Sequence, residues 1–290
     1  MSVPAVVTIL GSGTMGPGIA AIFARAGAEA RLFDISEQAI ENAKGAVTMA
    51  QGVIEKLGSL EDKGGTVSFY TDMAESLAGT AFVVEAVPEK LELKQQVLAE
   101  TEKLVDDTVI IASNTSGIPI TAIAESLTRP ELFVGMHWSN PPHVIPMIEV
   151  VPGDKTSQST ADELVAIAHS FGYEAVVEKE KAGFVENRIL YAIMRESLAL
   201  VNEGIISQKD LDTCVRWGIG YKLAVVGPMR LLDMAGLDIY TSVAGYLNPD
   251  LSNSPEVPEV VSELVSQGKL GMKTAGGMFS YGDGDVQAIR

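Results

Sequence analysis

A glycine-rich turn between a short apolar strand and a helix constrains this chain more than any other feature. Val6–Leu10 is apolar and rich in β-branched residues, which is typical of a buried parallel strand. An Ala-rich helix is predicted over Gly16–Arg25. The turn between them, residues 11–16, reads Gly-Ser-Gly-Thr-Met-Gly and fits the pattern G-x-G-x-x-G. The chain therefore begins as a strand–turn–helix unit of an α/β fold.

Each glycine of this turn has a steric reason to be there. Gly11 permits the tight turn, Gly13 lets the backbone approach a pyrophosphate, and Gly16 lets the helix pack on the strand. The helix N-terminus adds free N–H groups and a positive dipole, which suit phosphates. We therefore predict a dinucleotide site that also includes Thr14 and Met15. The alternative is a turn with only a structural role.

Asp34 indicates which dinucleotide binds. It ends a second predicted strand, residues 30–34, and lies 18 residues past Gly16, close to the separation expected of the acid that binds the ribose hydroxyls. A carboxylate there repels a 2′-phosphate, and no Arg or Lys follows immediately. The sequence therefore favours NAD over NADP as the cofactor.

The rest of the chain predicts a two-domain α/β protein. Further strands are expected at residues 82–87, 108–112, 132–138 and 147–151, with helices at 36–57 and 91–104. This alternation implies a mainly parallel Rossmann-like sheet covered on both faces. After about Lys181 the pattern becomes mainly helical, beginning with an amphipathic helix over 184–202. We expect an NAD-binding domain at 1–183 and an all-α domain at 184–290.

Composition excludes several classes of protein. The chain has 290 residues, a formal net charge of -17 and 47% hydrophobic residues, which argues against disorder and against nucleic-acid or anionic-membrane partners. The single cysteine, Cys214, cannot form an internal disulfide or a zinc site, and no metal is expected. No segment approaches the ~20 apolar residues of a membrane span. These features favour the cytoplasm.

His137 is the candidate catalytic base. It lies near the end of a predicted strand that Asn140-Pro141-Pro142 stops, and ligands of open α/β sheets bind beyond the carboxyl ends of the strands. An imidazole, with a pKa near 6.5, can take a hydroxyl proton near neutral pH. Glu149 on the next strand could hold its tautomer and stabilise the imidazolium. The alternative is a strand-end histidine beside an unrelated surface glutamate.

Several ordered blocks resemble the 3-hydroxyacyl-CoA dehydrogenase family along nearly the whole chain. They are the turn at 11–18, Val84-Glu85-Ala86-Val87-Pro88-Glu89 running to Lys94, Ser113-Asn114-Thr115-Ser116, Gly135-Met136-His137 with Asn140-Pro141, Ile148-Glu149-Val150, Gly183-Phe184-Val185-Glu186-Asn187-Arg188, Gly227-Pro228, Gly236-Leu237-Asp238 and Lys273-Thr274. The resemblance implies a Rossmann-like domain followed by a helical domain that forms a homodimer.

The resemblance also implies roles for individual residues. His137 is the general base in alcohol oxidation and the acid in reduction, and Glu149 orients it. Ser116 and Asn187 form hydrogen bonds around the reacting carbonyl and the histidine. At the cofactor, the implied residues are Glu89, Lys94, Ser116, Asn140 and Lys273. Glu85 is expected to be structural.

Two departures from the family bear on the substrate. The stretch between Asp34 and Asp72, which in the family forms a helical arm that helps hold CoA, is shorter and contains few basic residues, whereas a CoA phosphate clamp needs cations. The link at residues 220–227 is longer than in acyl-CoA members, and His137 is followed by Trp138-Ser139 rather than two aromatic residues.

These departures leave several functions open. In the first interpretation, the chain transfers hydride between NAD and a 3-hydroxyacyl-CoA or a related hydroxy acid. The alternative is a small non-CoA alcohol or aldehyde that carries a carboxylate, like those of gulonate, carnitine or pyridine-aldehyde dehydrogenases, with an aldehyde oxidised through its hydrate. Candidate cations for that carboxylate are Arg188, Arg216, Lys222 and Arg230. A minor alternative is a non-catalytic NAD-binding structural protein, like the lens crystallin of this family.

Overall fold

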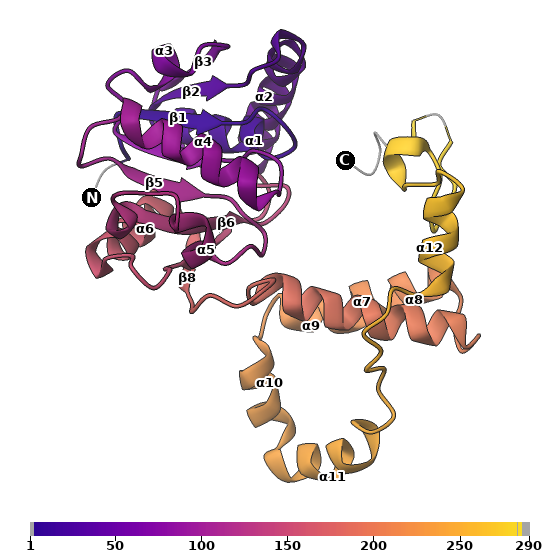
Figure 1. The fold of residues 1–290 in the computed structure, drawn as a ribbon. Coiled ribbons are helices and arrows are strands. Elements are labelled where there is room, and N and C mark those ends of the chain that lie inside the picture. Colours follow the sequence, from indigo (N-terminus) through magenta and orange to yellow (C-terminus); the bar gives the residue numbers. More distant parts are fainter. Residues whose placement is uncertain (1–2, 283, 286–290) are drawn as a thin grey trace. The chain divides into compact units, whose positions relative to one another are not determined.

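The computed structural model describes residues 3–282 and 284–285 and divides the chain into two compact units, Met1–Asn187 and Arg188–Arg290 (Figure 1). The first unit is an α/β domain and the second is helical. The sequence analysis expected the change near residue 183, and the first helix after it, α7 (Glu186–Asn202), begins just before the division between the units.

An eight-stranded sheet forms the centre of the first unit in the described part of the chain, in the order β3-β2-β1-β4-β5-β6-β7-β8. Its strands are β1 (Val6–Leu10), β2 (Glu29–Phe33), β3 (Thr66–Tyr70), β4 (Phe82–Glu85), β5 (Ile110–Ser113), β6 (Phe133–Trp138), β7 (Met147–Val151) and β8 (Glu174–Val177). All neighbours pair in parallel except β6 and β7, which are antiparallel. The order 3-2-1-4-5-6 is that of a dinucleotide-binding fold, whose ligand site lies where the order reverses, between β1 and β4.

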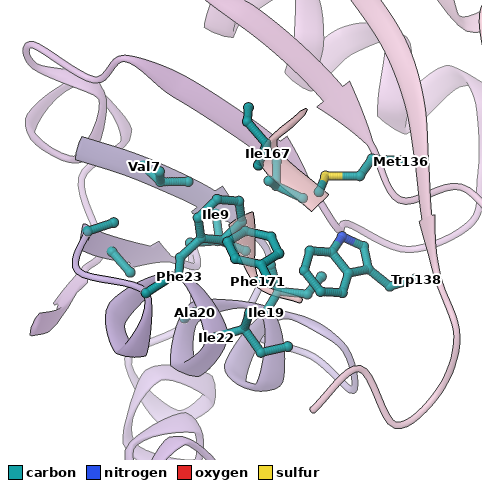
Figure 2. Packing of buried hydrophobic residues seen from close by; sticks show 14 of the residues in the cluster. Val7, Ile9, Ile19, Ala20, Ile22, Phe23, Met136, Trp138, Ile167 and Phe171 are labelled. Atoms are coloured by element: carbon teal, nitrogen blue, oxygen red, sulfur yellow. The ribbon is translucent and has the colours of Figure 1, made fainter. Parts of the chain in front are cut away.

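Helices cover both faces of this sheet, as the sequence predicted. One face packs against α1 (Gly16–Arg25), α2 (Glu37–Leu57) and α6 (Gln158–Ser170), and the other against α3 (Met73–Leu77), α4 (Leu91–Leu104) and α5 (Ile120–Ala124). Figure 2 shows the first of these cores, where Phe23 of α1 meets Phe171 edge-on with ring centroids 4.9 Å apart and Trp138 of β6 packs beside them. This core fixes the end of β6 against the helix that follows the glycine-rich turn.

The second unit consists of helices and turns. They are α7, α8 (Gln208–Cys214), the π-helix η2 (Val215–Gly220), α9 (Tyr221–Leu223), α10 (Pro228–Ala235), α11 (Leu237–Leu247), α12 (Glu259–Ser266) and the 3-10 turn η3 (Met272–Thr274). Among its described residues none is buried, although many are apolar. Within the described residues, no helix is long and apolar enough to cross a membrane.

The structure adds features that the sequence analysis did not predict. The edge strands β3 and β8 were missed, and β7 runs antiparallel to β6, although the alternation of strands and helices suggested parallel pairing. The η1 turn (Pro130–Leu132) takes the first residue of the predicted strand at 132–138. The helices predicted over 16–25 and 91–104 and the strand over 147–151 have the expected bounds.

Candidate active site

The glycine-rich turn has the geometry of a phosphate cradle. Gly11 has φ 109°, and a Cβ there would lie 2.5 Å from the carbonyl oxygen of Ala86, so only glycine fits between β1 and β4. A Cβ on Gly16 would strike the Gly11 carbonyl, whereas the space over Gly13 is open. Met15, at the N-cap of α1, makes no side-chain capping bond. The first-turn N–H groups therefore have room for an anionic ligand, which fits the predicted dinucleotide.

Asp34 lies beside this turn at the carboxyl end of β2. Its Oδ2 accepts hydrogen bonds from the Ser12 N–H at 3.0 Å and from the Ser12 hydroxyl at 2.8 Å, and its Oδ1 accepts the N–H of Ser36 at 3.1 Å. A carboxylate offers about four lone-pair sites, so it can still accept ribose hydroxyls. Asp34 thus links the phosphate turn to the predicted ribose position.

His137 and Glu149 form a buried pair. They are directly opposite one another in the antiparallel ladder of β6 and β7, so their side chains share one face of the sheet. His137 Nδ1 lies 2.6 Å from Glu149 Oε2, and the two residues are 6% and 2% exposed. The predicted contact between His137 and Glu149 is therefore made in the antiparallel pairing of β6 with β7.

Glu149 is ionised in this environment. Burial raises the pKa of its carboxyl, but hydrogen bonds from His137 and from the N–H groups of Glu186 and Val185 outweigh burial and leave the pKa below its usual value. Its Oε1 accepts these two N–H groups at 2.7 and 3.1 Å. An ionised Glu149 accepts the proton of His137 Nδ1, which leaves Nε2 as the basic nitrogen of the ring.

The segment before α7 holds this pair in place. The Phe184 ring is fully buried with its centroid 5.5 Å from that of His137, and Phe184 has φ 49° after Gly183 at φ 78°. The carboxylate of Glu186 accepts the hydroxyl of Ser139, the residue that follows β6, at 2.5 Å. The His137 ring is therefore confined by packing as well as by its hydrogen bond.

A buried ion pair joins the end of β4 to α4. Lys94 Nζ is 2.8 Å from Glu85 Oε1, and the two residues are 1% and 0% exposed. The ammonium also donates to the Val87 carbonyl at 3.3 Å and lies 3.3 Å from Glu89 Oε2, while the Ser113 hydroxyl donates to Glu85 at 2.5 Å. The described partners of Lys94 are thus protein groups, and its predicted contact with the cofactor stays a prediction.

Glu89 faces outward from this network. Its Oε1 accepts the Thr115 hydroxyl at 2.6 Å and the Ser116 N–H at 2.8 Å. Burial raises the pKa of Glu89, but these bonds and the positive charge of Lys94 lower it below its usual value. Its carboxylate is ionised and half exposed at the carboxyl end of the sheet, which is where the family resemblance puts the cofactor.

The remaining predicted residues are placed as follows. Asn187 Nδ2 donates to the Ser116 carbonyl at 3.0 Å, and within the described residues neither side chain bonds to the His137 ring. Asn140 is exposed on the loop after β6, whose Pro142 carbonyl accepts the Tyr173 hydroxyl at 2.8 Å. Lys273 lies in η3 of the second unit. The four candidate cations for a substrate carboxylate lie elsewhere in the same unit: Arg188, Arg216, Lys222 and Arg230. The contacts of all five residues with ligands stay predictions.

Three carboxylates near the site, those of Glu85, Glu178 and Glu186, were not among the predicted site residues, and an oxygen of Glu186 lies within 4.8 Å of His137 and Glu149. Glu85 was expected to be structural, and its place in an apolar strand, nine residues before Lys94, is the signal of a buried ion pair. Glu178 follows β8 and shares the Val185 N–H with Glu149, each accepting it at 3.1 Å. No pattern in the sequence marks Glu178, because its neighbourhood is created by the pairing of β7 with β8.

Models of two protein-family domains match the chain. The model of the 3-hydroxyacyl-CoA dehydrogenase NAD-binding domain matches residues 6–181, and that of the 3-hydroxyacyl-CoA dehydrogenase C-terminal domain matches residues 183–281. Together they cover both units.

Known proteins similar to this chain include enzymes of two substrate classes. The 5-formyl-3-hydroxy-2-methylpyridine 4-carboxylate 5-dehydrogenase of Mesorhizobium japonicum is 48% identical over 98% of this chain and 93% of the relative. Human mitochondrial hydroxyacyl-coenzyme A dehydrogenase is 33% identical over 95% of this chain and 90% of the relative. A crystal structure of a dehydrogenase for the same pyridine acid, described as an NAD+-dependent dismutase, superposes with a TM-score of 0.94 at 47% identity, covering 99% of this chain and 94% of the other.

Proposed function

The chain belongs to the 3-hydroxyacyl-CoA dehydrogenase family and is an NAD-dependent dehydrogenase, and we propose that its substrate is a small pyridine aldehyde bearing a carboxylate. The observation that carries the proposal is the 48% identity with a pyridine-aldehyde dehydrogenase over nearly the whole chain, against 33% with an acyl-CoA enzyme. A small aldehyde that carries a carboxylate is the alternative that the sequence analysis left open beside an acyl-CoA substrate.

The helix α2 supports a substrate without CoA. It lies in the stretch that the family resemblance identifies as the CoA-holding arm, and it packs on the core through Ile40, Ala43, Val47, Ala50 and Ile54. The Lys44 ammonium is 2.6 Å from Glu41 of the same helix, so its charge is already balanced. A CoA phosphate group would need concentrated cationic donors, which α2 does not supply.

His137 is the proposed base in oxidation. Because Glu149 accepts the Nδ1 proton, Nε2 is free to take a proton from water as the water oxygen adds to the aldehyde carbon. NAD, when bound, accepts the hydride that then leaves this carbon. Aldehyde, water and NAD+ give the carboxylic acid, NADH and one proton, and the proton departs through His137. Glu149 stabilises the imidazolium that exists between these transfers.

The other site residues position the ligands. Asp34 and Glu89 are proposed to bind ribose hydroxyls, and the turn at 11–16 to bind the pyrophosphate. Ser116 and Asn187, joined by their 3.0 Å hydrogen bond, are proposed to contact the reacting carbonyl. A substrate carboxylate needs a cation, and the candidates are Arg188, Arg216, Lys222 and Arg230.

The same site can catalyse both the oxidation and the reduction of an aldehyde. His137 as imidazolium can return a proton to an aldehyde oxygen during reduction, so one aldehyde can be oxidised while a second is reduced to the alcohol with the NADH just formed. Two aldehydes and one water then give one acid and one alcohol, with no net use of NAD. The description of a 47% identical relative as a dismutase supports this proposal.

A homodimer through the helical unit is the proposed assembly. Large apolar side chains of that unit are exposed, among them Trp217 at 67%, Val225 at 79%, Met229 at 69% and Met234 at 71%. This much apolar surface on consecutive helices favours a partner surface. The proposed compartment is the cytoplasm, in keeping with the free thiol of Cys214.

A substrate screen tests the proposal. Purified protein is incubated with 5-formyl-3-hydroxy-2-methylpyridine 4-carboxylate and NAD, and the acid and alcohol products are quantified by chromatography, because dismutation leaves no net NADH. In parallel, oxidation of NADH by acetoacetyl-CoA is followed at 340 nm. We expect turnover of the aldehyde to the acid, no oxidation of NADH by the CoA ester, and no turnover by His137→Leu, which should bind NADH almost unchanged. Rapid turnover of acetoacetyl-CoA without turnover of the aldehyde would restore the acyl-CoA substrate.

A further inference from the structure

Three ionisable side chains form a row across adjacent strands on one face of the sheet. His137 of β6 pairs directly with Glu149 of β7, and Glu149 pairs with Val176 of β8. Because side chains alternate along a strand, Glu178, two residues past Val176, lies on the same face as Glu149. Its N–H continues the ladder by donating to the Val150 carbonyl at 3.1 Å. The carboxyl of Glu178 therefore lies next to Glu149, on the side away from His137.

The two carboxyls compete for one hydrogen-bond donor. The Val185 N–H lies 3.1 Å from Oε1 of both Glu149 and Glu178. Glu149 has two further donors, His137 and the Glu186 N–H, whereas Oε2 of Glu178 is buried and, within the described residues, has no hydrogen-bond partner. Two anions side by side with so few donors are unfavourable, so Glu178 is the carboxyl that keeps a proton more readily.

The charges around Glu178 support this assignment. Burial and the negative charge of Glu149 raise the pKa of Glu178 to about 7, against a smaller opposite effect of the Val185 N–H and of His137. The Glu186 carboxylate has an oxygen within 4.8 Å of both His137 and Glu149, and it accepts the Ser139 hydroxyl. The Glu180 carboxylate accepts the Thr121 N–H, and Lys179 and Lys181 are exposed.

We propose that Glu178 is a positioning residue that acts through Glu149 to set how strongly His137 holds its proton. When Glu178 is protonated, it adds no negative charge beside Glu149, and the imidazolium is less stabilised. When Glu178 ionises, a second negative charge stabilises the imidazolium. The inference rests on the proposed roles of His137 and Glu149, and it adds a group that tunes the base near neutral pH.

The test follows the histidine directly and needs no substrate. The chain has three histidines, so NMR of protein labelled at the histidine Cε1 gives few resonances, and His137→Leu identifies the one from His137. Glu178→Gln keeps an oxygen to accept the Val185 N–H but removes the charge. We expect the His137 titration midpoint to fall by about half a pH unit, because a charge that acts from behind Glu149 should have a smaller effect than a directly paired charge, whose effect is about 1–3 pH units.

Two controls separate this effect from a general loss of structure. Glu174→Gln removes the same charge from the exposed start of β8 and should leave the midpoint unchanged. Glu178→Asp, which keeps the charge, should bring the midpoint back toward that of the unaltered protein. An unchanged midpoint in Glu178→Gln, or an equal change in Glu174→Gln, would overturn the proposal.

A second measurement uses the unaltered protein, should Glu178→Gln fail to fold. Infrared difference spectra between pH 6 and pH 8.5 should show the loss of the C=O stretch of a protonated carboxyl group, and an absence of this band would also overturn the proposal. Both measurements are independent of turnover. If the pyridine aldehyde is not a substrate but the midpoint moves, the proposed function fails and the role of Glu178 stands.

Discussion

The replacement Glu149→Gln tests the central pair most directly, because it changes charge and proton position with little change in shape. The amide oxygen of the new side chain can continue to accept the N–H groups of Val185 and Glu186, which now lie 3.1 and 2.7 Å from Oε1 of Glu149. The amide NH2 group then faces His137 Nδ1, which must accept a hydrogen bond instead of donating one. The ring proton moves to Nε2, so the base loses its free lone pair.

The expected loss follows from the geometry. With Nδ1 and Oε2 2.6 Å apart, the centres of charge of an imidazolium and the carboxylate are roughly 4 Å apart, and at an effective dielectric constant near 20 their attraction is about 4 kcal/mol. Since each 1.36 kcal/mol of lost transition-state stabilisation is tenfold in rate, kcat/KM should fall about 1,000-fold.

The assay is formation of the carboxylic acid from the aldehyde, quantified by chromatography, with NADH affinity measured by fluorescence titration. We expect NADH affinity within about twofold of the unaltered protein, because Glu149 bonds to His137 and to backbone N–H groups. Glu174→Gln is the matched control and should keep full activity. If Glu149→Gln retained more than a tenth of kcat/KM while His137→Leu was inactive, the reasoning on the tautomer and the charge would be refuted.

Three further outcomes are expected. Asp34→Ala should weaken NAD binding about 10- to 100-fold and reduce the preference for NAD over NADP, because it removes charge-assisted hydrogen bonds and leaves Ser12 without its carboxylate partner. An unchanged ratio of NAD and NADP affinities in titrations would contradict the ribose contact. Lys94→Met should reduce the free energy of unfolding by about 3–5 kcal/mol, because it leaves Glu85 buried without its partner, and denaturant unfolding measures this; full stability would count against the ion pair. Because the pKa of Glu178 is raised to about 7 in the folded protein, its stabilising effect is complete below the unfolded value near 4.3 and is lost as pH rises through 7. Glu178→Gln should therefore be more stable than the unaltered protein at pH 8, by about 1–2 kcal/mol after allowing for solvent screening, and similar to it at pH 4; equal pH profiles of thermal unfolding would contradict this.

Local patterns were sufficient for the elements that control cofactor binding. The glycine turn, the helix over 16–25 and Asp34 at the end of β2 depend on sequence-local rules of backbone sterics and helix capping, and the structure places them together. The family resemblance extended this to Glu89 and Ser116, which the structure joins by a 2.8 Å hydrogen bond. Their roles toward ligands stay predictions.

Edge strands and strand direction could not be predicted in the same way. β3 and β8 are short and partly exposed, and Val176 and Val177 of β8 lack the burial that marks a central strand. The direction of β7 depends on the short connection from β6, in which the Pro142 carbonyl is held by the Tyr173 hydroxyl. Alternating apolar residues look the same in parallel and antiparallel strands.

By itself, the sequence determined the α/β class, the dinucleotide turn, the preference for NAD and the histidine at the end of β6, because each follows from residue types at fixed spacing. Only the tertiary structure decided that Glu149 lies 2.6 Å from His137, that Glu85 holds Lys94 in the core, and that Glu178 stands behind the pair. These contacts join strands far apart in the chain, and the electrostatic effect of a carboxyl depends on the burial and donors that such contacts create.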